Sequence, residues 1–217
     1  MSNTVTELIL VRHGETLWNR ERRMQGQTDV PLSEIGLKQA HAVGQRLAQE
    51  KFAALYSSDL ARAYATAEAI AHASGKPIIS DKALRERTFG IFEGLTSPEI
   101  AVRYPLENER FAAREPDYVV PGGESSRAFY ERGLACLTRI ANTHAGERVV
   151  VVTHGLVLDT LYRAARGMDL APRREAPLYN ASLNTFRYVD GGWIEVTWGD
   201  VEHLADVGVT HYGGRVA

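Results

Sequence analysis

The chain has 217 residues, of which 44% are hydrophobic and 24% are charged, a balance typical of a globular protein with a substantial core. Its formal net charge is −2, which argues against a general binder of nucleic acid or of anionic membranes. The single cysteine, Cys136, excludes an intrachain disulfide and a cysteine zinc cluster. Residues 1–7 contain no basic segment and precede only a short apolar run, so we expect no signal peptide or membrane span and predict a cytoplasmic protein.

The first predicted strand covers residues 8–11, an unbroken apolar run that suits a strand buried on both faces. Arg12 and His13 follow at the point where this strand should end, and Gly14 comes directly after them. Two polar side chains at the mouth of a buried strand favour a bound anion, and glycine lets a ligand approach the backbone closely. A histidine that caps the strand end by bonding to nearby carbonyl oxygens explains this stretch equally well.

Helix and strand patterns alternate after this run. Ser33 is predicted to cap one helix and Asp59 the next. A polar helical stretch then begins with Ser97 as its predicted cap and Pro98 as its first helical residue. The predicted elements are, in chain order, a helix stripe over 37–47, a strand at 52–56, a helix stripe over 63–71, a strand at 77–79, a helix stripe over 129–140 and a strand at 148–153.

Three further segments complete the predicted organisation. Residues of about 97–124 show no clear core stripe, and we interpret them as a helical insertion over the strand ends, a natural place for a lid. Residues 182–188 and 193–198 are joined by Asp190-Gly191-Gly192, which predicts an antiparallel hairpin at one edge of the sheet. The tail of about 201–217 is expected to be poorly ordered at its end.

The alternation of strands and helices predicts a single α/β domain over residues 1–217, with three α/β/α layers and a mostly parallel central sheet. In such sheets ligands bind at the carboxyl ends of the strands. The candidate residues at this edge are Arg12 and His13 after the first strand, Arg62 early in the helix after the second, Glu86 after the third, and His154 after the strand at 148–153.

Two arginines and two histidines around one point would form a cationic pocket, and the planar fork of arginine suits phosphate oxygens. Phosphate monoesters hydrolyse extremely slowly unaided, so an enzyme must neutralise the phosphoryl oxygens and supply a nucleophile and a proton donor. Histidine has an ordinary pKa of roughly 6.5, so it is mostly neutral at pH 7 and can be the nucleophile. Glu86 is the best placed candidate for the general acid.

The motifs of other catalytic machineries are missing. The sequence has no G-x-x-x-x-G-K-[ST] phosphate loop, no G-x-G-x-x-G turn, no H-E-x-x-H zinc motif and no G-x-S-x-G elbow. The histidines show no other metal-ligand spacing, so we expect no metal. Cys136 lies inside an amphipathic helix pattern and is predicted to be a core residue and not a nucleophile.

Short segments spread over nearly the whole chain form an ordered pattern, namely 10–16 (LVRHGET), Asn19, 25–26, 31–36, 57–63, 84–86, 122–125 and 153–155. This pattern resembles the histidine phosphatase superfamily, which includes cofactor-dependent phosphoglycerate mutases and acid phosphatases. The resemblance implies that His13 becomes a phosphohistidine and that Glu86 donates a proton and later activates water. It further implies that Arg12, Arg62 and His154 hold the phosphoryl group, that no metal is needed, and that the substrate contacts are Asn19, Gln25, Gly26 and Gly155.

Mutases and phosphatases of this family differ in what accepts the phosphoryl group. The mutases follow their Glu-Arg pair with a tyrosine and, a little later, a lysine, whereas this chain has Phe89 and Ser97 at or near those places. Their insertion also carries an adjacent arginine pair and a proline run, whereas this chain has only Arg110 and Arg114 there. We therefore favour a phosphomonoesterase of the broad-specificity or cobalamin-pathway type, which acts on small phosphorylated metabolites without a cofactor.

The sequence leaves two alternative functions open. A phosphoglycerate mutase is the runner-up, and it alone would need a 2,3-bisphosphoglycerate primer. A non-catalytic protein that binds a phosphorylated ligand is the second alternative, although His13, Glu86 and His154 are all present. We expect a small phosphorylated substrate, no nucleic acid or membrane partner, and a monomer or homodimer.

Overall fold

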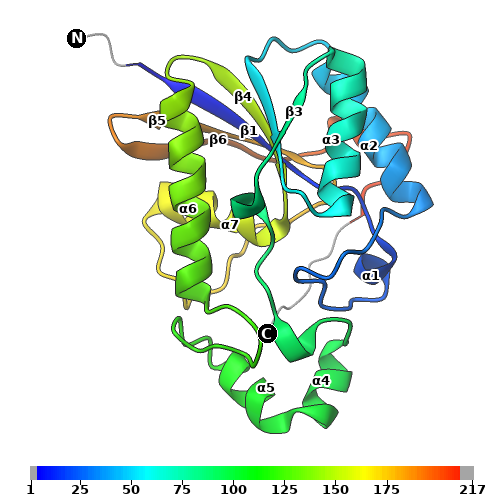
Figure 1. Ribbon diagram of the computed structural model, residues 1–217, viewed down its shortest axis with the longest axis vertical. Helices are drawn as coiled ribbons and strands as arrows, with labels where there is room; N and C mark the ends of the chain where they lie inside the picture. The colour runs from blue at the N-terminus through cyan, green and yellow to red at the C-terminus, as the bar shows by residue number, and fades with distance from the viewer. Residues whose placement is uncertain (1–3, 211–217) are drawn as a thin grey trace.

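The computed structural model describes residues 4–210, and its centre is a six-stranded sheet with the strand order β3-β2-β4-β1-β5-β6 (Figure 1). Strands β1, β2, β3 and β4 run parallel to one another, while β5 is antiparallel to β1 and β6 is antiparallel to β5. The predicted mostly parallel sheet with an antiparallel edge hairpin is therefore confirmed. The strands are β1 (Thr6–Arg12), β2 (Ala54–Ser57), β3 (Ile78–Ser80), β4 (Arg148–Thr153), β5 (Leu183–Val189) and β6 (Gly192–Asp200).

Helices cover both faces of the sheet. The α-helices are α1 (Leu17–Arg20), α2 (Glu34–Leu47), α3 (Ala61–Ser74), α4 (Ser97–Arg103), α5 (Pro105–Ala112), α6 (Ser126–Thr143) and α7 (Gly155–Arg166). Short 3-10 turns lie at η1 (Lys82–Leu84), η2 (Gly90–Phe92) and η3 (Glu202–Leu204). Of the predicted tail, Leu204 in η3 is fully buried, while residues 211–217, where disorder was expected, lie outside the described residues.

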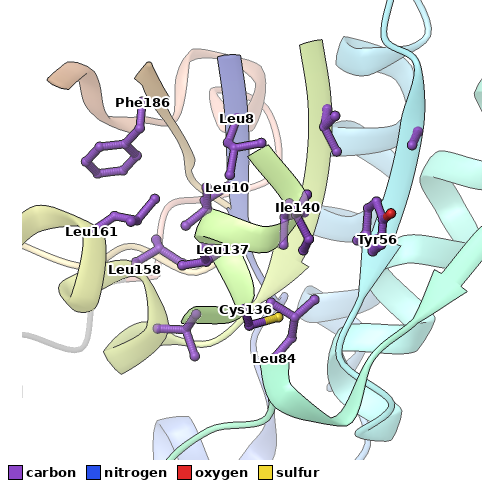
Figure 2. Close-up of a cluster of buried hydrophobic side chains, with 14 of the residues drawn as sticks. Leu8, Leu10, Tyr56, Leu84, Cys136, Leu137, Ile140, Leu158, Leu161 and Phe186 are labelled. Carbon is purple, nitrogen blue, oxygen red and sulfur yellow. The ribbon is translucent and has the colours of Figure 1, made fainter. Parts of the chain in front are cut away.

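The side chains of strand β1 point alternately to the two faces of the sheet, as in any β-strand. Both faces are apolar, so helices pack on each of them and form three layers. Leu8 and Leu10 pack with α6 and α7 in one core cluster, which Figure 2 shows. Ile9 and Val11 pack with α2 and α3 in a second cluster on the other face. Cys136 is 4% exposed within the first cluster, so its prediction as a core residue is confirmed.

Two predicted helix caps are wrong. Asp59 does not cap α3; its carboxylate forms a bidentate ion pair with Arg85 at 2.6 and 2.7 Å, and Asp29 from a distant loop accepts the Ala61 N–H at 2.7 Å instead. The cap of α4 is Thr96 rather than Ser97, and Thr96 forms a capping box with Glu99. For α3, a competing ion-pair partner removed the Asp59 carboxylate from the cap position. For α4, the capped position lies one residue earlier than predicted, so Ser97 is the first helical residue.

The insertion shares a small core with the segment that follows Glu86, and the sequence pattern did not reveal this core. This core consists of Phe89, Phe92, Ile100, Phe111, Tyr118 and Val120. Leu156 of α7 packs against it, so α4 and α5 rest beside the edge of the sheet where the strands end (Figure 1). Within residues 4–210 no helix is long and apolar enough to span a membrane.

Candidate active site

The two strand-end histidines lie side by side. β1 ends at Arg12 and β4 ends at Thr153, and these two residues are partners in the parallel ladder. His13 and His154 follow directly, so both reach the carboxyl edge of the sheet, where ligands of such folds bind. Their ring centroids are 5.2 Å apart, with the ring planes tilted by 56°.

The hydrogen bond of His13 determines which ring nitrogen carries the proton. Nδ1 lies 2.7 Å from the carbonyl oxygen of Gly14, and because a carbonyl only accepts, Nδ1 must donate. Nε2 of the neutral ring then keeps its lone pair. Burial, together with the positive charges of Arg62 and Arg12, holds the pKa of His13 well below 6.5. The imidazole is therefore neutral at pH 7 and carries a nucleophilic nitrogen.

His154 is fully buried at the start of α7. Its Nε2 pairs with the hydroxyl of Ser58 at 2.8 Å, and its Nδ1 has no hydrogen-bond partner among the described residues. Burial, followed by the positive charge of Arg62, lowers the pKa of His154 well below 6.5. A buried ring nitrogen without a protein partner is a suitable contact for a ligand oxygen.

Arg62 projects from the first turn of α3 and is 1% exposed. Its Nη1 and Nη2 donate to the carbonyl oxygens of Thr28 at 3.0 Å and Gly26 at 2.7 Å, and its Nε has no partner among the described residues. Burial lowers the pKa of Arg62 to about 10, so the guanidinium stays positive at neutral pH. Arg12 is 7% exposed and donates from Nη1 to the carbonyl of Leu178 at 2.7 Å. A buried guanidinium held by neutral carbonyls retains charge for an anion.

Glu86 reaches the same edge from the segment after η1. Its two carboxylate oxygens accept from the backbone N–H of Arg87 at 2.8 Å and of Leu156, in the first turn of α7, at 3.1 Å. Burial raises the pKa of Glu86 above 4.5, although these two hydrogen bonds act in the opposite direction. A carboxyl group whose proton is retained to higher pH is suited to donate it.

The four residues predicted to touch the substrate make hydrogen bonds or close contacts with other protein groups. Asn19 Oδ1 accepts from the backbone N–H of Thr16 at 3.1 Å. The Thr16 hydroxyl, which has one proton to donate, lies 3.1 Å from Asn19 Oδ1 and 3.0 Å from Gln25 Oε1. A Cβ on Gly155 would come within 3.2 Å of a Leu178 methyl and 3.6 Å of Arg12 Nε, so glycine permits close packing there. Gly26 supplies a carbonyl to Arg62 and has a φ of +56°.

Three residues of this centre were not singled out from the sequence. Ser58 holds His154; Asn180 donates from Nδ2 to the carbonyl of His13 at 3.0 Å; and Glu93 binds the loop that holds Arg62. Ser58 directly follows a buried strand, which is the same signal that drew attention to His13. Asn180 and Glu93 lie in irregular segments, where no local pattern marks them.

Because two histidines are buried and neutral, we expect the free energy of unfolding to fall in mild acid. In the unfolded chain they bind protons near pH 6.5, whereas the folded protein keeps His13 and His154 neutral well below that pH. Unfolding therefore takes up protons, and the free energy of unfolding should fall as the pH drops from about 6.5 towards the lowered pKa values, by up to about 1.4 kcal/mol per pH unit for each histidine. Urea unfolding in phosphate-free buffer at neutral pH and about one unit below 6.5 measures this decline.

A variant with one buried imidazole fewer is the matched comparison. His154→Asn should show a shallower decline with acid than the wild type, and an equal slope would contradict the prediction. Glu86 contributes in the opposite sense, because its raised pKa makes the folded protein hold a proton that the unfolded chain loses near pH 4.5. The difference between the two proteins removes that contribution, since both retain Glu86.

The fold and the residues at its edge define an α/β protein with a buried cluster of two histidines and two arginines at the carboxyl ends of the strands. Residues 8–201 match the sequence profile of the histidine phosphatase superfamily (branch 1), and the chain belongs to this family.

Relatives in this family carry both phosphatase and mutase-like names. A metal-independent phosphoserine phosphatase of Arabidopsis thaliana is 42% identical over 216 residues, covering 98% of this chain and 89% of the relative. Phosphoglycerate mutase-like protein 4 of the same plant is 43% identical over 211 residues, covering 95% and 90%. Among solved structures, Bacillus stearothermophilus YhfR superposes with a TM-score of 0.83 at 38% identity, over 92% of this chain and 99% of that one.

Proposed function

We propose that the protein hydrolyses phosphomonoesters of small metabolites through a covalent phosphohistidine on His13, without a metal. The observation that carries the proposal is the neutral His13 ring, whose Nδ1 is tied to Gly14 and whose Nε2 is left as a nucleophile beside His154. Two buried guanidinium groups, of Arg12 and Arg62, supply the positive charge that phosphoryl oxygens need. A relative named as a metal-independent phosphoserine phosphatase supports the same chemistry.

In the first step, the Nε2 lone pair of His13 attacks phosphorus while the bond to the leaving oxygen breaks. Glu86 gives its proton to that oxygen, so the product leaves as a neutral alcohol. The charges of Arg12 and Arg62, and a hydrogen bond from His154, stabilise the three oxygens of the transferring group.

In the second step, the Glu86 carboxylate takes a proton from water. The oxygen of that water attacks phosphorus, the N–P bond breaks, and the electron pair returns to Nε2 of His13. Inorganic phosphate leaves, Glu86 is protonated again, and both residues are ready for another cycle.

Hydrolysis is favoured over phosphoglycerate mutase activity by the segment after Glu86. Phe89, at the position of the mutase tyrosine, is 5% exposed and packs edge-on against Phe111 with ring centroids 6.1 Å apart. Phenylalanine has no hydroxyl for a substrate, and the ring of Phe89 is packed in a hydrophobic core. Ser97, near the position of the mutase lysine, is an exposed residue at the start of α4.

We expect the protein to release phosphate from a generic aryl phosphate at an unchanged rate when a metal chelator is added. Steady-state release of the phenol, with and without the chelator, measures this. An inert protein that nevertheless binds inorganic phosphate in calorimetry would instead be a phospho-ligand binding module. Conversion of 3-phosphoglycerate that exceeds its hydrolysis when a bisphosphate primer is present would make the protein a mutase.

A further inference from the structure

We propose that Glu93 is a positioning residue, which ties the loop that holds Arg62 to the segment that carries Glu86 and so fixes the phosphoryl-binding and proton-donating groups relative to each other. The expected effect on kcat/KM rests on the proposed function. The hydrogen bonds that carry it are independent of that function.

Five donors from two chain segments converge on the half-buried Glu93 carboxylate. Oε1 accepts from the backbone N–H of Gln27 at 3.1 Å, the hydroxyl of Thr88 at 3.0 Å and the backbone N–H of Phe89 at 2.9 Å. Oε2 accepts from the backbone N–H of Thr28 at 2.9 Å and from the Thr28 hydroxyl at 2.5 Å. One carboxylate thus joins residues 27–28 to residues 88–89.

The first of these segments also holds Arg62. The carbonyl oxygens of Gly26 and Thr28 accept from the Arg62 guanidinium, while the N–H groups of Gln27 and Thr28 point to Glu93. The loop is therefore clamped between a cation and an anion through its own peptide groups. Without the Glu93 carboxylate, the peptide N–H groups of Gln27, Thr28 and Phe89 would lose their partners, and the carbonyls that orient Arg62 would be freed to shift.

Gly26 shows how close this approach is. A Cβ at this position would lie 1.9 Å from Glu93 Oε1, and its φ of +56° is a conformation that favours glycine. Glycine is thus required at position 26 both for the turn and for the approach of the carboxylate.

The second segment carries the proposed acid. Thr88 and Phe89 follow Glu86 by two and three residues, and Gln27 Nε2 donates to the backbone carbonyl of Glu86 at 3.1 Å. Loop 26–28 and segment 86–89 therefore touch both directly and through Glu93. A displacement of either one changes the distance between the Arg62 guanidinium and the Glu86 carboxyl.

Glu93 also acts through its charge. Burial alone would raise the pKa of Glu93, but hydrogen bonds from Thr28, Phe89, Gln27 and Thr88 lower it below 4.5, so the side chain is anionic at neutral pH. Its negative charge favours the cationic form of Arg62, against the burial of that guanidinium. An uncharged side chain at position 93 removes the anionic acceptor for these hydrogen bonds and the negative charge that favours the cationic form of Arg62.

The test compares Glu93→Gln with Glu99→Gln. Glu99 is a matched control, because it too accepts from a backbone N–H and a hydroxyl, those of Thr96, but it does so at the exposed start of α4. We expect Glu93→Gln to weaken the binding of inorganic phosphate in calorimetry and to lower kcat/KM for an aryl phosphate, each by about 10- to 100-fold. Glu99→Gln should match the wild type in both, and Glu93→Asp, which keeps the charge, should recover part of the loss.

The outcomes separate positioning from folding alone. If Glu93→Gln lowers Tm but keeps wild-type phosphate affinity and kcat/KM below that temperature, Glu93 serves only stability and the inference is wrong. If Glu93→Gln does not fold, Thr28→Val removes one of the five donors, and wild-type values of both constants would equally overturn the inference. If the wild type binds phosphate but hydrolyses nothing, the proposed function fails while the affinities still decide the role of Glu93.

Discussion

Replacing His13 with alanine is expected to lower kcat for an aryl phosphate by about 10⁴-fold or more, because loss of a nucleophile removes the covalent route. Phosphate binding should persist in this variant, since Arg12, Arg62 and His154 remain to hold the oxygens. Initial rates of phenol release measure the first effect, and calorimetric titration with inorganic phosphate measures the second.

His41 offers a matched control for this substitution, because it is an exposed histidine on α2. His41→Ala should turn over like the wild type, which shows that loss of an imidazole elsewhere has no effect. If His13→Ala retained activity within tenfold of the wild type, the nucleophile would have to be another group.

Replacing Glu86 with glutamine is expected to slow the release of a poor leaving group, such as an alkoxide, by about 10²- to 10⁴-fold. The amide keeps the shape of the side chain but has no acidic proton for the leaving oxygen. A good leaving group, such as a nitrophenolate, needs little protonation, so its release in the first turnover should slow far less. Rapid-mixing measurements of that first release on both substrates give the comparison.

The pH dependence of the same step provides a second readout for Glu86. The protonated fraction of Glu86 falls as the pH rises through its raised pKa, so the rate with a poor leaving group should fall along that limb. Glu86→Gln should lack the limb. Equal slowing for both leaving groups, or an unchanged limb in the variant, would remove Glu86 from the acid role.

The parts of the fold that the sequence predicted well are those with strong local signals. The run at 148–153 has four consecutive valines between Arg148 and Thr153 and forms β4 with the predicted bounds. The turn at Asp190-Gly191 joins β5 to β6 as expected. The predicted cap of α4 was wrong by one residue within the same turn, whereas the predicted cap of α3 was wrong because of a tertiary contact. Asp59 forms an ion pair with Arg85, which comes from another segment, and no local sequence pattern indicates this pairing.

The insertion illustrates the same limit. Its core residues are spread over two short helices, a 3-10 turn and a loop, so no helical period connects Ile100 with Phe111 and Tyr118. The partner surface for these side chains is the segment after Glu86, which the sequence shows only as irregular. Periodicity identifies a core when one element supplies the stripe, and it fails when several short elements share one.

In the candidate site, too, some residues could be predicted from local sequence and others could not. Arg12, His13 and His154 could be predicted to meet because they follow parallel strands whose carboxyl ends share one edge of the sheet. The structure adds that these two strands are neighbours, and it places the His13 and His154 rings side by side. Asn180, which holds the His13 carbonyl, could not be predicted because it comes from a loop 167 residues away in the chain. Local sequence identifies the reacting groups, whereas the groups that hold them in place come from long-range contacts.

The central claim is that one imidazole, that of His13, carries the phosphoryl group. Quenching a turnover of aryl phosphate in alkali, where phosphohistidine survives, and mapping the modified peptide by mass spectrometry tests it most directly. We expect a phosphoryl adduct on His13 that is lost in acid and that accumulates in Glu86→Gln, where activation of water is impaired. A protein that hydrolyses the substrate without ever carrying such an adduct, or that carries it on another residue, would contradict the claim.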